Sequence, residues 1–238
     1  MKFTILTILP EFFDGFLTTS LIGKARENGR IKTDLVNIRD FATDIHNTVD
    51  DVPFGGGAGM VMKPDVMSSA IEQARIDNPN APVLAMTPRG KTFSQEKAQE
   101  LSEKGSIILV CGRYEGIDQR VLNNYVDEEI SIGDYVLAGG EAAALVVLEA
   151  TARLVPGVMG NSSSLDEESF SKQRLEYDQY TRPREFRGEA VPDILMSGHH
   201  ANIEKWRKKN ALETTIQRRA DLIEKYALTD EEKKLLDL

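Results

Sequence analysis

In the stretch Ser106-Ile-Ile-Leu-Val-Cys-Gly-Arg-Tyr-Glu-Gly-Ile-Asp118, an apolar, strand-like run leads directly into a glycine-rich loop. The same order recurs where Glu129–Ile132 leads into Ser131-Ile-Gly-Asp-Tyr-Val-Leu-Ala-Gly-Gly-Glu141. Glycine lets backbone amides come close to a ligand, and ligands of α/β sheets bind beyond the carboxyl ends of the strands. The two loops therefore predict one pocket, rich in backbone donors and acceptors and poor in charge. Such a pocket suits a nucleoside-like cofactor better than a polyphosphate.

Strand-like and helix-like segments alternate on both sides of these loops. The predicted strands are Lys2–Leu9, Ile31–Ile38, Pro82–Met86, Ser106–Val110 and Glu129–Ile132. The predicted helices are one opening at Pro10, Pro64–Ile76, Ser94–Glu103 with Ser94 as its N-cap, Ile117–Tyr125 and Gly140–Val155. This alternation predicts an α/β fold with a parallel sheet and helices on both faces.

The composition changes after Gly160. Residues 161–174 are polar and short of core residues, which predicts a flexible linker. From about Ile203 the pattern is amphipathic and helical, so we expect a small all-helical domain over 175–238 after a sheet domain over 1–160.

Charge and cysteine content narrow the function classes. The net charge is −9, yet 172–219 holds 11 Lys and Arg against 7 Asp and Glu and is net +4. That segment is compatible with local RNA contact or with solvated helix faces. The single cysteine, Cys111, excludes an internal disulfide and reads as a core thiol. With neither a signal peptide nor a membrane-spanning apolar run, we expect a cytoplasmic protein and no membrane partner.

Other suggestive motifs have simpler interpretations. Pro53-Phe-Gly-Gly-Gly-Ala-Gly-Met60 fits neither the phosphate-binding nor the dinucleotide-binding pattern, and we expect a loop that approaches a ligand or a partner chain. Asp50 and Asp51 are compatible with metal or base-edge contact and equally with a solvated turn. The histidines have no metal-ligand spacing.

An ordered series of motifs resembles the bacterial tRNA (guanine-N1)-methyltransferases, the TrmD family of the knotted SPOUT class. The series consists of Phe3–Thr7 with Pro10-Glu11, Thr48–Asp51, Pro53–Met60, Cys111–Asp118, Ser131–Glu141, Pro156–Val158, Glu168-Ser-Phe170, Tyr180–Pro183 and Val191–His199. It spans both predicted domains and is therefore far more specific than one glycine motif.

The resemblance implies a SPOUT-type sheet tied into a carboxyl-terminal trefoil knot whose loops bind S-adenosylmethionine. It also implies a homodimer with its active site between the subunits. It implies a tRNA substrate contacted by the helical domain, and a requirement for Mg²⁺ with no metal ligands assigned. The implied cofactor-binding residues are Thr87, Pro88, Gly112, Tyr114, Glu115, Ile132, Gly133, Asp134, Tyr135, Val136, Leu137, Gly139 and Gly140. We expect valine at Gly133 or Gly140 to abolish cofactor binding with little loss of fold.

The implied catalytic residues are Arg153, before Pro-Gly-Val, and Glu168, before Ser-Phe, where relatives commonly carry aspartate. Taken alone, Arg153 also reads as a cation at a helix carboxyl end, and Glu168 as a solvated charge beside Asp166 and Glu167.

Two other functions are compatible with the sequence. One is a SPOUT RNA methyltransferase of different specificity, such as ribose 2′-O-methylation, and the other is a non-catalytic RNA-binding module. The Tyr180–Pro183 motif and the helical tail favour transfer to guanine N1, 3′ to the anticodon (position 37), and the two intact loops speak against a module without catalysis.

Overall fold

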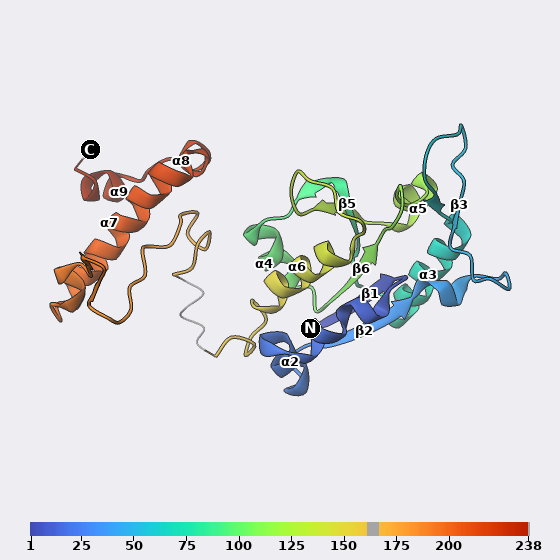
Figure 1. Cartoon of the computed structure of the whole chain (residues 1–238), viewed down its shortest axis with the longest axis horizontal. Helices are drawn as coiled ribbons and strands as arrows, with labels where there is room; N and C mark the ends of the chain where they lie inside the picture. Colours follow the sequence, from blue (N-terminus) through green and yellow to red (C-terminus); the bar gives the residue numbers. More distant parts are fainter. Residues whose placement is uncertain (161–166, 238) are drawn as a thin grey trace. The chain divides into compact units, whose positions relative to one another are not determined.

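The computed structural model describes residues 1–160 and 167–237, and its chain divides into two compact units, Met1–Gly160 and Asn161–Leu238 (Figure 1). No described helix is both long and apolar enough to cross a lipid bilayer.

A five-stranded parallel sheet forms the centre of the first unit, with strand order β2-β1-β6-β5-β7. Its strands are β1 (Lys2–Thr7), β2 (Lys32–Asn37), β5 (Val83–Thr92), β6 (Ser106–Cys111) and β7 (Glu128–Ser131). A separate antiparallel pair, β3 (Asp50–Asp51) and β4 (Val61–Met62), flanks the glycine-rich loop Pro53–Met60. The predicted parallel α/β sheet is confirmed.

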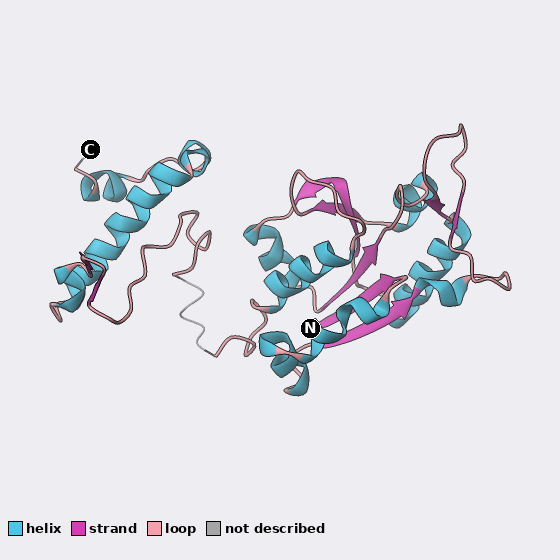
Figure 2. Ribbon diagram, viewed as in Figure 1, coloured by secondary structure: helices cyan, strands magenta, loops and turns pink. Residues whose placement is uncertain are grey.

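Helices cover both faces of this sheet (Figure 2). The helical segments of the unit are η1 (Pro10–Phe13), α1 (Asp14–Thr18), α2 (Ser20–Glu27), η2 (Ile38–Phe41), α3 (Pro64–Asp77), α4 (Gln95–Ser102), α5 (Gln119–Tyr125) and α6 (Glu141–Ala152). Ser94 caps α4 as predicted, because its Oγ accepts a hydrogen bond from the Lys97 amide at 3.3 Å.

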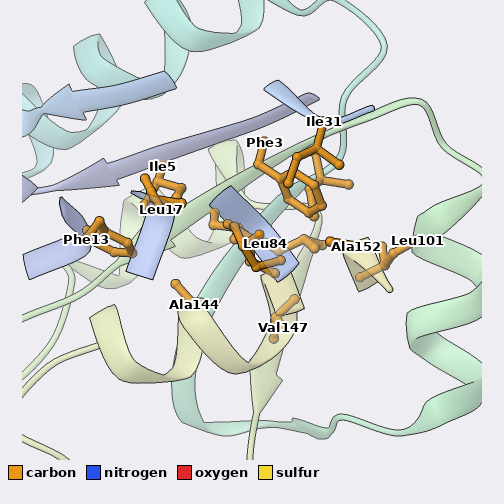
Figure 3. Packing of buried hydrophobic residues seen from close by; sticks show 14 of the residues in the cluster. Phe3, Ile5, Phe13, Leu17, Ile31, Leu84, Leu101, Ala144, Val147 and Ala152 are labelled. Atoms are coloured by element: carbon orange, nitrogen blue, oxygen red, sulfur yellow. The ribbon is translucent and has the colours of Figure 1, made fainter. Parts of the chain in front are cut away.

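Alternate residues of the buried strands supply two separate cores. In β6, Ile107 and Leu109 pack with α1, α2, α4 and α6, and this core is drawn in Figure 3. Ile108 and Val110 face the opposite side and pack with α3 and α5. The two-residue period of a strand thus explains why β6 is apolar throughout.

Strand β5 is longer than the predicted Pro82–Met86. It is interrupted between Met86 and Lys91 and then pairs with β7 again, so that both residues oppose Ile130. Gly90 lies at the end of this interruption, where an added Cβ would collide with the backbone of Glu129. An irregular strand of this kind departs from simple periodicity, which is why its second half escaped the sequence analysis.

The second unit contains η4 (Asp193–Met196), α7 (His200–Arg218), α8 (Ala220–Lys225) and α9 (Asp230–Leu235). It is not all-helical as predicted, because β8 (Glu185–Phe186) and β9 (Glu189–Ala190) form a short hairpin. Arg187 and Gly188 connect them with φ angles of 53° and 88°, as a two-residue hairpin turn requires.

The predicted linker falls partly outside the described residues, which exclude 161–166. Residues 167–174 form a hydrogen-bonded turn, in which the Phe170 amide donates to the Arg174 carbonyl at 2.7 Å.

Candidate active site

A cavity of about 270 Å³ lies at the carboxyl ends of β6 and β7 and beside the interruption in β5. Every implied cofactor residue except Asp134 lines it: Thr87, Pro88, Gly112, Tyr114, Glu115, Ile132, Gly133, Tyr135, Val136, Leu137, Gly139 and Gly140. The cavity is also lined by residues that were not among the implied cofactor contacts: Arg113 and Ile117 of the first quoted loop, and Arg89, Leu122 and Ala143, which carry no glycine-loop signature. Parallel strands thus bring the two quoted loops to one edge of the sheet.

Close backbone packing requires glycine at the end of the second loop. The Gly140 amide donates to the Gly112 carbonyl at 2.8 Å, and an added Cβ would lie 2.9 Å from the Cys111 Cα. The expectation that Gly140→Val spares the fold is therefore wrong, since the clash is with the backbone of β6 rather than with a ligand. Gly133 differs, because an added Cβ there would meet the Tyr135 ring at 2.7 Å and the φ angle is +144°.

A buried ion pair fastens the two loops together. The Glu141 carboxylate is 1% exposed; it accepts a hydrogen bond from Arg113 Nε at 2.9 Å and one from Thr7 Oγ1 at 2.8 Å. Thr7 lies at the end of β1, Arg113 follows β6, and Glu141 begins α6. Three segments distant in sequence are therefore held at one point beside the cavity.

The neighbouring Cys111 is a core thiol, as predicted. It is completely buried, and burial, followed by the Glu141 carboxylate, raises the pKa of the thiol well above its usual value. A thiol in this state is protonated at neutral pH and is no nucleophile.

The glycine-rich loop Pro53–Met60 ends against the first cofactor loop. The Glu115 amide donates to the Met60 carbonyl at 2.9 Å, and the Met62 amide donates to the Gly116 carbonyl at 2.9 Å. An added Cβ at Gly59 would collide with the Glu115 carboxylate. The tip of the loop projects away from the core, with Phe54 99% exposed.

The two implied catalytic residues do not line this cavity. Arg153 follows α6 at its carboxyl end, whereas Gly140 and Ala143 meet the cavity at its amino end. Ten residues of helix separate Ala143 from Arg153, about 15 Å along the axis. Glu168 belongs to the second unit and borders a different cavity of about 470 Å³.

The acidic neighbours of Glu168 have different environments. Glu167 accepts a hydrogen bond from the Tyr177 hydroxyl at 3.1 Å, and its Oε2 lies 4.0 Å from Arg207 Nη1. Asp166 lies outside the described residues.

Aromatic and basic residues, together with the carboxylates of Glu167, Asp178 and Glu204, line another cavity of the second unit, of about 680 Å³. Tyr180 and Arg182 of the predicted motif line it together with Tyr177, Arg184, His200 and Arg207. The Arg207 guanidinium lies 4.8 Å from the Tyr177 ring centre, and Tyr180 packs against Trp206 with ring centres 6.3 Å apart. Flat rings next to cations are the groups that bind unpaired bases and phosphates.

Within 1–160 and 167–237, no three His, Cys, Asp or Glu side chains come together as a metal site. Asp50 and Asp51 form the short β3, and Asp51 accepts a hydrogen bond from the adjacent Val52 amide at 2.7 Å. The described residues therefore do not form a ready-made cage for Mg²⁺, although a carboxylate such as Glu115 can supply a single ligand.

Comparison with known proteins gives matches over nearly the whole chain. Residues 1–225 match the family model described as tRNA (Guanine-1)-methyltransferase TrmD. A Carboxydothermus hydrogenoformans protein named tRNA (guanine-N(1)-)-methyltransferase is 54% identical over 99% of this chain and 92% of its own. Proteins of the same name from Clostridium perfringens (54% identical, 99% of each chain) and Citrifermentans bemidjiense (51% identical, 99% of this chain and 94% of its own) are similar.

Proposed function

The chain belongs to the TrmD family of tRNA (guanine-1)-methyltransferases, and on this premise we propose that it methylates N1 of the guanine 3′ to the anticodon (position 37). The methyl donor is S-adenosylmethionine. Because the substrate is tRNA, we propose that the enzyme acts in the cytoplasm.

The glycine-lined cavity beside β5, β6 and β7 is the observation that carries this proposal. Its loops offer backbone groups and apolar side chains, among them the exposed Tyr135 and Val136, and a Cβ at Gly133 would press on the Tyr135 ring. These features suit a nucleoside with an uncharged edge and an apolar ring face. S-adenosylmethionine, when bound there, supplies an electrophilic methyl group. The loops after β6 and β7 hold the donor and exclude water from it.

Guanine N1 carries a proton at neutral pH and is a poor nucleophile until that proton leaves. We propose that the Glu168 carboxylate accepts the N1 proton as the methyl group is transferred. The Arg153 guanidinium stabilises the negative charge that develops on O6 when N1 is deprotonated. The two groups act on opposite sides of one amide-like unit, so each makes the other's task easier.

A dimer would bring these groups to the donor cavity. Arg153 lies about 15 Å along α6 from the cavity of its own chain. We propose that a second copy supplies Arg153, and that the chain from β7 through residues 132–140 into α6 forms the trefoil knot. Helix α6 supports this arrangement, because it is apolar almost throughout and leaves Val146 46% exposed.

The second unit is proposed to hold the RNA. N1 lies on the pairing edge of guanine, so the base must leave its stack before it can react. The cavity containing Tyr177, Tyr180 and Arg182 offers rings and cations for neighbouring nucleotides and their phosphates. Mg²⁺ is proposed as an activator, and no step is assigned to it because the described residues do not build its site.

Methyl transfer to an in vitro transcribed tRNA tests this function. The product is digested to nucleosides and identified by mass spectrometry, with a transcript carrying adenine at position 37 as the matched control. We expect N1-methylguanosine from the first transcript only. A ribose-methylated nucleoside would indicate the alternative specificity, and tight tRNA binding without any methylated product would indicate a non-catalytic module.

A further inference from the structure

The turn that carries Glu168 is folded onto the second unit by its own contacts. The Ser171 amide donates to the Glu168 carbonyl at 3.2 Å, and the Glu176 amide donates to Ser169 Oγ at 3.0 Å. Phe170 has a φ angle of +73°, a left-handed conformation that a non-glycine residue keeps only when its surroundings hold it. The backbone around Glu168 therefore depends on an anchor nearby.

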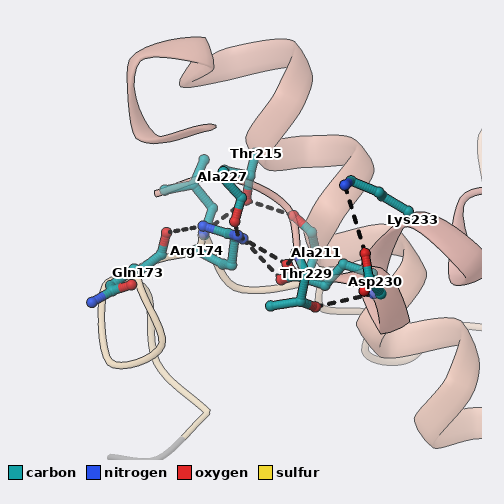
Figure 4. Close-up of polar contacts among 10 residues, drawn as sticks. Gln173, Arg174, Ala211, Thr215, Ala227, Thr229, Asp230 and Lys233 are labelled. Carbon is teal, nitrogen blue, oxygen red and sulfur yellow. Dashed lines mark hydrogen bonds and ion pairs between the residues drawn. The ribbon is translucent and has the colours of Figure 1, made fainter. Parts of the chain in front are cut away.

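Arg174 is that anchor (Figure 4). Its Nε and Nη2 donate to the two carboxylate oxygens of Glu232, each at 3.0 Å, and its Nη2 also donates to the Ala227 carbonyl at 3.4 Å. The Arg174 side chain is only 11% exposed and that of Glu232 only 22%. A two-point ion pair shielded in this way fixes direction as well as distance.

Arg174 is linked directly to the turn. The carbonyl of Arg174 accepts the hydrogen bond from the Phe170 amide, and the next amide, Leu175, donates to Thr215 Oγ1 of α7 at 2.9 Å. Glu232 is itself fixed at the start of α9, where it and Thr229 form a reciprocal capping box. The path from α9 to Glu168 thus runs through Glu232, Arg174 and Phe170.

We infer that Arg174, held by Glu232, is a positioning residue for proton removal, because it fixes on the second unit the turn that carries the Glu168 carboxylate. The inference rests on the proposed role of Glu168 as the base. Arg174 itself is assigned no contact with the reacting atoms. A misplaced base costs rate even when substrate binding is intact.

A double-mutant cycle on the full-length protein tests this inference by single-turnover methyl transfer to the tRNA transcript. We expect Arg174→Ala to lower the rate about 10-fold or more, and Glu232→Gln to lower it in the same direction. In a Glu168→Gln background the same changes should alter the residual rate by less than about twofold, because Arg174 acts through Glu168. Asp230→Asn is the matched control, since it removes the exposed pair with Lys233 on the same helix and should leave the rate unchanged.

Hydrogen exchange supplies a readout that does not depend on activity. Without tRNA, a peptide covering 168–176 should be protected in the wild type and in Asp230→Asn, and exposed in Arg174→Ala and Glu232→Gln. Filter binding should show tRNA affinity nearly unchanged in all four proteins.

Three results would overturn the positioning role. The first is a wild-type rate in both Arg174→Ala and Glu232→Gln. The second is a loss of rate in the Glu168→Gln background as large as the loss in the wild-type background. The third is a peptide 168–176 that already exchanges freely in the wild type. If Arg174→Ala fails to fold, Glu232→Gln decides the outcome, because glutamine preserves the capping box. A wild-type rate in Glu168→Gln alone would overturn the proposed base and the positioning role together.

Discussion

The family resemblance leads us to expect aspartate before Ser-Phe, and the Glu168 carboxylate is one methylene longer. The longer side chain keeps the chemistry of a base and changes its reach. Its backbone belongs to a structured turn, so reach is set by the side chain together with the anchor described above. At this scale, the side chain of Glu168 and the missing side chains of the cavity glycines can be tested by single substitutions.

Glu168→Gln preserves size and hydrogen bonding but cannot accept a proton. We expect the single-turnover rate to fall about 10²-fold or more, the loss typical of a missing general base, with tRNA affinity kept. Glu168→Asp should retain substantial activity. Glu167→Gln is the control, because Glu167 is engaged by Tyr177; a large loss in Glu167→Gln with a normal rate in Glu168→Gln would transfer the role to Glu167.

Gly133→Ala and Gly140→Ala should fail in different ways. Alanine at Gly140 presses on the Cys111 backbone, so we expect the free energy of unfolding to fall by about 1–3 kcal/mol. Alanine at Gly133 moves the Tyr135 ring and strains a backbone with a φ angle of +144°, so we expect weaker binding of S-adenosylmethionine by calorimetry together with a loss of stability. Gly15 in α1 has open space around it, so Gly15→Ala should lower neither the stability nor the affinity for S-adenosylmethionine. Wild-type affinity for S-adenosylmethionine in Gly133→Ala would contradict this distinction.

At the scale of elements, single side chains join segments that are far apart in the sequence. Glu141 joins α6 to β1 and to the loop after β6, and Glu232 joins α9 to the turn bearing Glu168. Both are shielded carboxylates with an arginine partner. Such pairs add little net stability when intact, but removal of one partner leaves a charge without compensation.

Arg113→Ala should lower the free energy of unfolding by about 3 kcal/mol, because Glu141 is left charged and buried. Urea unfolding followed by far-ultraviolet circular dichroism measures this loss. Arg120→Ala removes an exposed arginine that pairs with Asp118, and it should leave the midpoint nearly unchanged. Equal urea midpoints for Arg113→Ala and Arg120→Ala would show that the pair of Arg113 and Glu141 does not hold the two glycine-rich loops together.

Glu232 makes the second unit sensitive to acid. Burial raises the pKa of this carboxyl, but hydrogen bonds from Arg174 and from the Thr229 amide outweigh burial and hold the pKa below its usual 4.5. The unfolded chain therefore binds the proton more readily, so this stabilisation is present above about pH 4.5 and is lost as the pH falls through the folded pKa. Trp206, the one tryptophan, lies in α7 and reports on this unit by fluorescence. Glu232→Gln should flatten the acid-dependent loss of stability, and an unchanged pH profile would contradict this.

At the scale of the whole molecule, the proposed reaction needs three parts. The first unit provides the donor cavity, the carboxyl end of α6 provides Arg153, and the second unit provides Glu168 and the RNA-facing rings. Since Arg153 and the cavity lie at opposite ends of α6, we propose that one chain does not complete a site by itself. Two copies related by symmetry would complete two sites.

Mixing two inactive chains tests this arrangement. Arg153→Ala keeps the cavity, and Gly133→Val keeps Arg153, so a mixed dimer has one intact site. Random exchange of equal amounts should restore about one quarter of wild-type activity, because half of the dimers are mixed and each has one working site. Arg153→Ala mixed with an Arg153→Ala/Gly133→Val double variant should stay inactive. A protein that is monomeric by light scattering and fully active at the same concentration would contradict the proposed dimer.

The sequence by itself predicted the strands of the parallel sheet apart from the second half of β5, the two glycine-rich loops that we propose bind the cofactor, and the family. These features are local, because a buried strand, a helix cap and a glycine-rich loop can each be recognised from about ten consecutive residues. It also predicted an edge of the sheet where the loops of β6 and β7 meet, since parallel strands end together.

Only the tertiary structure decided which side chains hold those loops and where the proposed catalytic groups stand. Thr7 meets Glu141 across 134 positions, and Arg174 meets Glu232 across 58. The need for glycine at Gly140, which precedes α6, arises from Cys111 on β6, and the separation of Arg153 from the cavity arises from the length of α6. Periodicity and propensity act along the chain, whereas packing and ion pairing act between segments that meet only after folding.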